Sequence, residues 1–202
     1  MLAMRAAVFG AAIEPHARGR GTIVDFGCAD GALLSRLDAD GKLGVEANPH
    51  SRRIAEARGL LVVSSLAEVP HHHADLVISN HVLEHVLAPH DALAAMRLIL
   101  RPGGKLVMNL PIDDWRYQRR VRLPDIDHHL YTWTPQLIAN LLRESGFERV
   151  STQVVNRAFP GRVAPILWRC LPPPAFAWAM RFTTAITKRR DIEAVAFAPC
   201  PT

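Results

Sequence analysis

Features that would assign this sequence to a special class of protein are scarce. Cysteine occurs three times in 202 residues, without metal-binding spacing or an even disulfide framework, at Cys28, Cys170 and Cys200. Such sparse cysteine suits a reducing compartment. The longest apolar run near the C-terminus, Cys170 to Met180, is too short to span a bilayer. A disulfide-stapled scaffold is therefore excluded, as is a transmembrane helix in that segment.

Signals for export and for nucleic-acid recognition are also weak. The segment from Met1 to Ile13 has too short an apolar run for a signal peptide, so we expect an amphipathic first helix and a cytoplasmic protein. The net charge of +5 comes without an aromatic-rich RNA motif or a DNA-reading helix pattern, which makes nucleic acid an unlikely partner. We interpret the basic clusters as a solvated face. They are Arg116, Arg119, Arg120 and Arg122, and Lys188, Arg189 and Arg190.

The sequence does contain a regular alternation of strand and helix patterns. Its length and its 49% of hydrophobic residues suit one domain over residues 1–202. The alternation predicts an α/β fold with a mainly parallel sheet covered on both faces. The predicted strands are Thr22–Phe26, Lys42–Glu46, Leu60–Ser64, Ala74–Ser79, Lys105–Leu110, Phe147–Val155 and Glu193–Ala198. The predicted helices are Ala32–Leu37, Pro49–Arg58, Pro89–Leu100 and Pro135–Ser145.

Two segments stand outside this alternation. Pro111 to Tyr131 is a long connection after a predicted strand, and such connections are often functional lids. Pro160 to Arg190 is an accessory segment, apolar and basic, interrupted by Pro172-Pro173-Pro174. Its mixture of aromatic and basic residues is typical of an interface, so we expect a lid or a peripheral membrane contact. A helix packed on the core is the alternative.

The first predicted strand ends in a turn of small residues, Gly27-Cys28-Ala29-Asp30-Gly31. Ligands of open α/β sheets bind beyond the carboxyl ends of strands, and small residues let the backbone approach them closely. The N-terminus of the helix predicted next would offer free N–H groups to a carboxylate. Glu46 ends the second predicted strand about 20 residues later, where an acidic residue can bind ribose hydroxyls. The dinucleotide fingerprint G-x-G-x-x-G is not met, because Ala29 and Ala32 occupy two of its glycine positions.

These segments resemble the motifs of class I S-adenosylmethionine (SAM) methyltransferases. Four similar segments occur in the family order and cover about residues 22–155. They are Asp25–Gly31, with Ala29 where the family usually has Gly, then Gly44–Pro49, Ala74–Val86 and Leu100–Leu106. The resemblance implies a Rossmann-like, doubly wound sheet of seven strands with SAM as the cofactor.

The resemblance also implies roles for single residues. Asp25, Gly27 and Gly31 would cradle the methionine part of SAM, Glu46 would hold the ribose hydroxyls, and Asn80 would lie beside the cofactor. The Asp that the family often has near the adenine is absent, so adenine recognition is expected from residues 65 and 66 and backbone groups. The complete expected cofactor set is Asp25, Gly27, Cys28, Ala29, Gly31, Glu46, Ala47, Ser65, Leu66 and Asn80.

Two histidine patterns suggest metal binding at first sight. His81 to His85 matches H-x-x-E-H, a zinc protease signature. The segment lies within a methyltransferase-like motif and has no clear third ligand, so we interpret it as a helix packing beside the cofactor. His71-His72-His73 is expected in a solvated turn, because consecutive side chains point in different directions. We expect no metal site.

Three histidines are candidates for a catalytic base. His128 and His129 lie on the long connection that faces the substrate in this family, and His85 follows the fourth strand. A histidine could take a proton from an acceptor hydroxyl as the methyl moves. Because adjacent residues of an extended segment point to opposite sides, we expect at most one of His128 and His129 to face the cofactor.

The leading hypothesis is a SAM-dependent methyltransferase acting on a small molecule, with oxygen as the expected methyl acceptor atom. A nucleic-acid methyltransferase and a non-catalytic SAM-binding module are the alternatives. The sequence does not indicate the oligomeric state.

Overall fold

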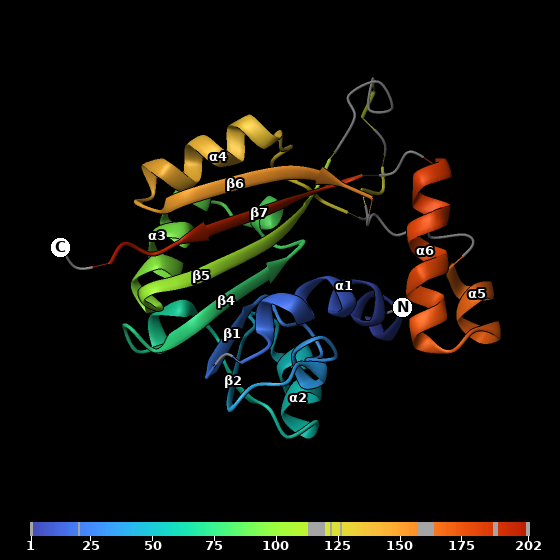
Figure 1. Cartoon of the computed structure of the whole chain (residues 1–202), viewed down its shortest axis with the longest axis horizontal. Coiled ribbons are helices and arrows are strands. Elements are labelled where there is room, and N and C mark those ends of the chain that lie inside the picture. Colours follow the sequence, from blue (N-terminus) through green and yellow to red (C-terminus); the bar gives the residue numbers. More distant parts are fainter. Residues whose placement is uncertain are drawn as a thin grey trace.

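A seven-stranded sheet with the order β3-β2-β1-β4-β5-β7-β6 forms the centre of the chain (Figure 1). The structure is a computed structural model that describes residues 2–19, 21–112, 120–121, 123–125, 127–156, 164–187 and 190–200. Strands β1 to β5 run parallel, and β7 runs antiparallel to both β5 and β6. The strands are β1 Thr22–Phe26, β2 Gly41–Val45, β3 Leu61–Val63, β4 Ala74–Asn80, β5 Leu100–Pro111, β6 Glu148–Val155 and β7 Asp191–Phe197. The predicted doubly wound α/β fold is confirmed.

The central strands are buried on both faces, which explains their nearly continuous apolar sequences. Neighbouring residues of one strand belong to different hydrophobic clusters, because side chains alternate across a sheet. In β4, Val77 lies in a cluster with Leu93 and Ile138 on one face. Leu76 lies in a cluster with Ile13 on the other. Helices therefore cover the sheet from both sides.

The helices begin and end where local chemistry requires. Asn48 accepts hydrogen bonds from the N–H groups of His50 and Ser51 and caps α2, whose first residue is a proline. Gly146, in a left-handed conformation at φ +82°, follows the end of α4. The helices are α1 Leu2–Ala17, α2 Pro49–Ala57, α3 Pro89–Ile99, α4 Pro135–Glu144, α5 Ala164–Cys170 and α6 Pro173–Thr187.

Two predicted helices were wrong, and one predicted strand is longer than expected. The helix expected over Ala32–Leu37 is only a single 3-10 turn, η1 Leu34–Arg36, and the helix expected after β4 is likewise a short turn, η3 Leu83–His85. The strand expected over Lys105–Leu110 is present but begins earlier, since β5 starts at Leu100. Its pairing with β4 jumps from Leu100 to Lys105 while β4 advances two residues, so the extra residues form a bulge.

The accessory segment forms two helices, α5 and α6, which lie beside α1 at the end of the molecule opposite the C-terminus (Figure 1). The three prolines interrupt the segment, as expected, because Pro172 lies between the two helices and Pro173 and Pro174 begin α6. Phe176 and Met180 of α6 are buried against Met4 and Val8 of α1. The first helix is therefore not amphipathic in the usual sense, because it is buried both against the sheet and against α6.

Much of the long connection, and most of the basic clusters, lie outside the described residues. Of the clusters, Arg120 and Arg190 are described, and both are exposed. In the part of the chain that the structure describes, no helix is long and apolar enough to cross a membrane.

Candidate functional site

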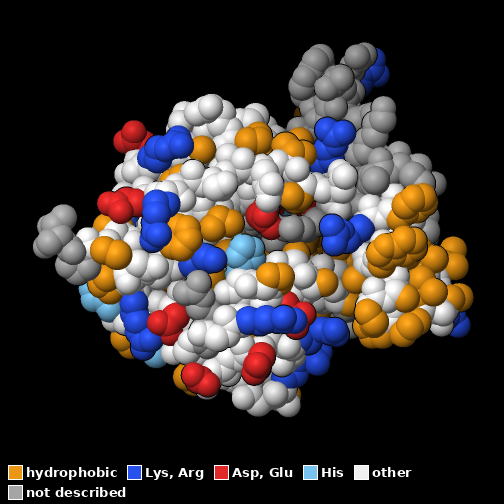
Figure 2. Space-filling model, in the orientation of Figure 1, with side chains coloured by type: hydrophobic (Ala, Val, Ile, Leu, Met, Phe, Trp, Pro, Cys, Tyr) orange, Lys and Arg blue, Asp and Glu red, His pale blue; other side chains and the backbone are white. Residues whose placement is uncertain are grey.

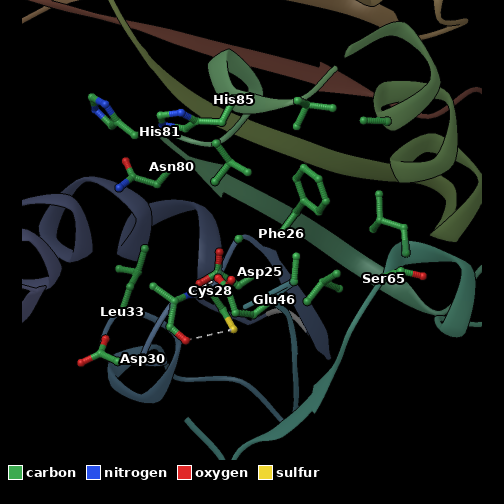
Figure 3. Close-up of a pocket in the computed structure, with 18 of the residues that line it drawn as sticks. Asp25, Phe26, Cys28, Asp30, Leu33, Glu46, Ser65, Asn80, His81 and His85 are labelled. Atoms are coloured by element: carbon green, nitrogen blue, oxygen red, sulfur yellow. Dashed lines mark hydrogen bonds between the residues drawn. The ribbon is translucent and has the colours of Figure 1, made fainter. Parts of the chain in front are cut away.

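A cavity of about 610 Å³ opens beyond the carboxyl ends of β1, β2 and β4 (Figure 3). This is the edge at which open parallel sheets bind ligands, and the volume lies within the range of small-molecule sites. Ala6 and Phe9 of α1 close one side. Nine of the ten predicted cofactor residues line the cavity, namely Asp25, Gly27, Cys28, Ala29, Glu46, Ala47, Ser65, Leu66 and Asn80. Gly31 does not line it.

The turn after β1 is built from residues in left-handed conformations. Gly27 has φ +79°, and a Cβ there would lie 2.2 Å from Cγ2 of Val82. The N–H groups of Gly27 and Cys28 donate to the carbonyl of Val45 and tie the turn to β2. Ala29 also has a positive φ of 48°, although it carries a side chain. The glycine that the family usually has at this position therefore matches a real conformational demand.

Gly31 does not contact the cavity and instead allows close packing of the turn against neighbouring side chains. Its φ is +73°, and a Cβ would lie 2.4 Å from Leu60 Cδ1 and 3.0 Å from Ala55 Cβ. No α-helix follows the turn, so the free N–H groups predicted at a helix N-terminus are not provided there. Recognition of a carboxylate at this end of the cavity would have to rely on loop backbone and side chains.

Glu46 joins the first two loops of the site. One carboxylate oxygen accepts from the N–H of Ala29 at 2.9 Å, and the other accepts from the N–H of Asn48 at 2.8 Å. A carboxylate has about four acceptor positions, so both oxygens retain capacity for ribose hydroxyls. Glu46 is therefore placed both to hold the loops together and to face a ligand in the cavity.

Asp25 is the buried acid of the site, with only 2% of its surface exposed. Burial, reinforced by the nearby negative charge of Glu46, raises the pKa of Asp25 from 3.8 to about 7. Burial and the same two carboxylates raise the pKa of the Cys28 thiol to about 12. Cys28 is therefore a neutral lining group, whereas Asp25 gains most from a cationic ligand.

The third loop carries Ser65 and Leu66 at the cavity wall. The Ser65 hydroxyl accepts from the N–H of Ala67, and the Glu68 carboxylate accepts from the N–H groups of Ser64 and Ser65, which together form a capping box. The Ser64 hydroxyl, which also donates to the Glu68 carboxylate, and these backbone N–H groups lower the pKa of Glu68. The capping box fixes the loop where the family often has an Asp near the adenine.

Asn80 provides an independent indication that a polar ligand fits here. It ends β4 and lines the cavity, and its buried Oδ1 has no hydrogen-bond partner among the described residues. A buried polar atom without a partner is costly, so a donor on a ligand would stabilise it. With the acids Asp25 and Glu46, this acceptor set suits a ligand that carries hydroxyls and positive charge, as SAM does.

The three predicted base candidates lie close together but only one lines the cavity, namely His85. The ring of His129 lies edge-on to His85 with centroids 5.0 Å apart. His128 contributes its carbonyl, which accepts from His85 Nδ1 at 3.3 Å. The expected alternation of His128 and His129 was based on an extended segment, and this premise is wrong because His128 has φ +48°.

Glu84 lies beneath these histidines and is fully buried. Burial raises its pKa, while His81, His85 and His129 oppose that rise. Neither carboxylate oxygen has a hydrogen-bond partner among the described residues. Ligand atoms of Glu84, His85 and His129 lie within 4.8 Å of one another, but His81, the first histidine of the H-x-x-E-H signature, does not belong to this group. The helix that this signature requires is absent, since η3 is a single turn.

His81 is the lining residue whose role the sequence did not reveal. Its Nε2 lies 3.2 Å from Asp191 Oδ2 on β7, and its ring packs edge-on against Phe9. A polar residue directly after a strand was the available signal. The partners, far apart in the sequence, were not predictable from it.

The remaining histidine tract is structural. The N–H groups of His72 and His73 donate to the carbonyls of Leu98 and Ile99, and His72 Nδ1 donates to the carbonyl of Leu100. These bonds fix the predicted turn against the end of α3. The tract does not line the cavity.

The fold and the cavity together define a nucleotide-cofactor-binding protein of the doubly wound α/β class. Residues 5–152 match the family described as "Methyltransferase domain". The chain belongs to this family, the SAM-dependent class I methyltransferases, and its cofactor is SAM.

Individual relatives agree with this assignment. Over 149 residues the chain is 32% identical to a ubiquinone biosynthesis O-methyltransferase of Roseobacter denitrificans, a match that covers 63% of this chain and 60% of that protein. The chain thus spans less than two thirds of that relative's length. A SAM-dependent methyltransferase of Thermotoga maritima, a possible histamine N-methyltransferase, has a similar fold, with a TM-score of 0.69, 14% identity and coverage of 98% and 92%. So does Haemonchus contortus phosphoethanolamine N-methyltransferase 2 in complex with SAM, with a TM-score of 0.65, 12% identity and coverage of 96% and 52%.

Proposed function

We propose that this chain transfers the methyl group of SAM to a hydroxyl of a small organic acceptor. Bound SAM supplies a methyl on a positively charged sulfur, which is already an activated leaving group. What the protein must add is alignment of the acceptor and, for a hydroxyl, a base. The name of the O-methyltransferase relative supports oxygen as the acceptor atom.

The cofactor half of the proposal assigns roles to the polar lining. Asp25 and Asn80 would face the charged methionine end, and Glu46 would accept the ribose hydroxyls. Ser65 and Leu66 would border the adenine. These assignments follow from the acceptor chemistry of the lining and from the family motifs that the sequence matches.

The observation that carries the choice of oxygen is the hydrogen-bonded state of His85. A carbonyl oxygen can only accept, so the bond to His128 requires the hydrogen on Nδ1 and leaves the lone pair on Nε2. Nε2 lies 4.0 Å from Glu84 Oε1, so the buried carboxyl could stabilise the imidazolium that forms when the base takes a proton. His85 is therefore our candidate base.

The test is incubation of the purified chain with methyl-labelled SAM and an extract of the source cells. The proposal expects label in a small organic product whose new methyl is bonded to oxygen. His85→Ala should lose this product, while His90→Ala, an exposed histidine on α3, should retain it. Label in RNA or DNA would support the nucleic-acid alternative. SAM binding without any transfer would support a non-catalytic module.

A further inference from the structure

Outside the cavity, the most prominent surface is the exposed side of the α5–α6 pair. Hydrophobic side chains gather over this end of the molecule in Figure 2. Trp178 is 71% exposed, Phe182 59% and Ile166 65%. The Trp178 and Phe182 rings lie one helical turn apart and stack with centroids 6.1 Å apart. Large aromatic groups are thus held in solvent on a helix whose other side is packed.

The charge on these two helices has a single sign. Between residues 157 and 190 the sequence contains seven Lys and Arg residues and no Asp or Glu, while an acid of the neighbouring helix, Glu14 of α1, lines a groove with Pro173 and Ala177. Arg169 and Arg181 are exposed on α5 and α6 themselves. Mixed-sign charge is the usual composition of a solvated surface, so an apolar face on two helices whose own charged residues are all basic indicates a partner that is apolar and anionic.

Helix α1 connects this surface to the cavity. Met4 and Val8 pack in one cluster with Phe176 and Met180 of α6. Phe9, from the next position of α1, lines the cavity. The exposed aromatic face is therefore separated from the site by the α6 and α1 layers only.

We propose that the exposed face of α5 and α6 docks on an anionic lipid bilayer. Trp178, Phe182 and Ile166 enter the interfacial region, and Arg169 and Arg181 lie near lipid phosphates. The absence of a spanning helix among the described residues fits a contact that lies on the surface. Exposed aromatics give the contact its apolar part, and the basic charge of the two helices selects anionic over zwitterionic lipid.

The test is co-sedimentation of the full chain with vesicles of phosphatidylcholine, with and without 30% phosphatidylglycerol. Binding is expected to the anionic vesicles and to weaken with added salt, because exposed charges are screened. Trp178→Ser combined with Phe182→Ser should reduce the partition coefficient at least tenfold. The matched control is Leu61→Ser with Val154→Ser, which removes two exposed apolar side chains from edge strands and should bind like the wild type.

The proposal is overturned if the wild type stays in the supernatant at low salt, or if the aromatic pair and the control pair behave alike. Sedimentation velocity tests whether a second copy of the chain, and not a bilayer, covers this surface. A dimer that dissociates on Trp178→Ser and binds no vesicles would show that the surface pairs two copies. Circular dichroism of both double variants confirms that a loss of binding is not a loss of fold. None of these measurements depends on methyl transfer.

Discussion

Two neighbouring acids of the cavity, Asp25 and Glu46, differ in what their surroundings provide. Glu46 accepts two backbone N–H groups, whereas Asp25 is buried beside it with a pKa raised to about 7. A cationic ligand stabilises the ionised form of Asp25, whereas burial in the ligand-free protein favours the protonated form. SAM binding should therefore release protons near neutrality.

The first prediction is a pH dependence of SAM affinity. As pH falls through about 7, Asp25 takes up a proton and loses its attraction for the cation, so the Kd for SAM should rise several-fold between pH 8 and pH 6. Titration calorimetry in buffers of different ionisation heat would report the released proton. Asp25→Asn should bind more weakly and with no such pH dependence. A wild-type Kd independent of pH would contradict this role.

The second prediction concerns the same residue and stability. A carboxyl whose folded pKa lies above its unfolded value of about 3.8 stabilises the fold at low pH, and that contribution is lost as pH rises toward 7. Asp25→Asn should therefore make the ligand-free protein more stable at pH 8, by roughly 1–3 kcal/mol. Urea unfolding of both proteins at pH 5 and pH 8 measures it. An Asp25→Asn variant less stable than the wild type at pH 8 would refute the proposed cost of burying the ionised Asp25 carboxylate.

The third prediction concerns Ala29, whose φ of 48° is costly for a residue with a side chain. Ala29→Gly should raise the free energy of unfolding by about 0.5–1 kcal/mol, because glycine adopts this region freely although it gains entropy when unfolded. SAM affinity should be kept or improved. Thermal unfolding and calorimetry check the two parts. The control is Ala32→Gly. Ala32 is not among the residues with a positive φ, so glycine at this position should lower the free energy of unfolding.

The fourth prediction ranks the three histidines. His85→Ala should lower turnover by about 10²–10⁴ with SAM binding intact, since it alone lines the cavity. His129→Ala should have a smaller effect through loss of packing on His85, and His128→Ala should be nearly silent because its carbonyl makes the contact. Single-turnover kinetics with the identified acceptor would rank them. Full turnover in His85→Ala would remove it as the base.

At the scale of elements, the loop after β1 is fixed by its packing against the loop after β4. Gly27→Ala should destabilise the protein strongly, because its Cβ would lie 2.2 Å from Val82 Cγ2 at a φ of +79°. Adding Val82→Ala removes both Cγ atoms but leaves the Cβ of residue 82 at 3.1 Å and the strained φ, so it should recover only part of the loss. A double-mutant cycle in urea measures this coupling. Additive effects of the two substitutions would mean that the loops are independent.

The central strands were predictable from sequence because burial on both faces leaves nearly continuous apolar runs, such as Leu76-Val77-Ile78 in β4. The helix expected over Ala32–Leu37 was not formed, although Leu33, Leu34 and Leu37 have helical spacing. These residues are instead buried in the cluster that contains Ile13 of α1. Local periodicity cannot show that another helix takes that place on the sheet, so tertiary packing decided the outcome.

At the scale of the whole molecule, the cavity depends on segments that sequence motifs do not connect. His81 contacts Asp191, 110 residues away, and Phe9 of α1 packs on the same ring. The cofactor side was predictable because its loops carry family motifs in order, whereas the acceptor side depends on contacts between distant segments. The long connection after β5 was predicted to be a lid, and part of it lies outside the described residues.

The central claim is that the cavity beyond β1, β2 and β4 binds SAM. Titration calorimetry of SAM and of its demethylated product at pH 8 tests it most directly, with Glu46→Ala as the variant and Glu56→Ala on α2 as the control. The account predicts one site for both ligands, a loss of roughly 1.5–3 kcal/mol in Glu46→Ala, and wild-type affinity in Glu56→Ala. Affinity unchanged in Glu46→Ala, or no binding to the folded wild type, would contradict it.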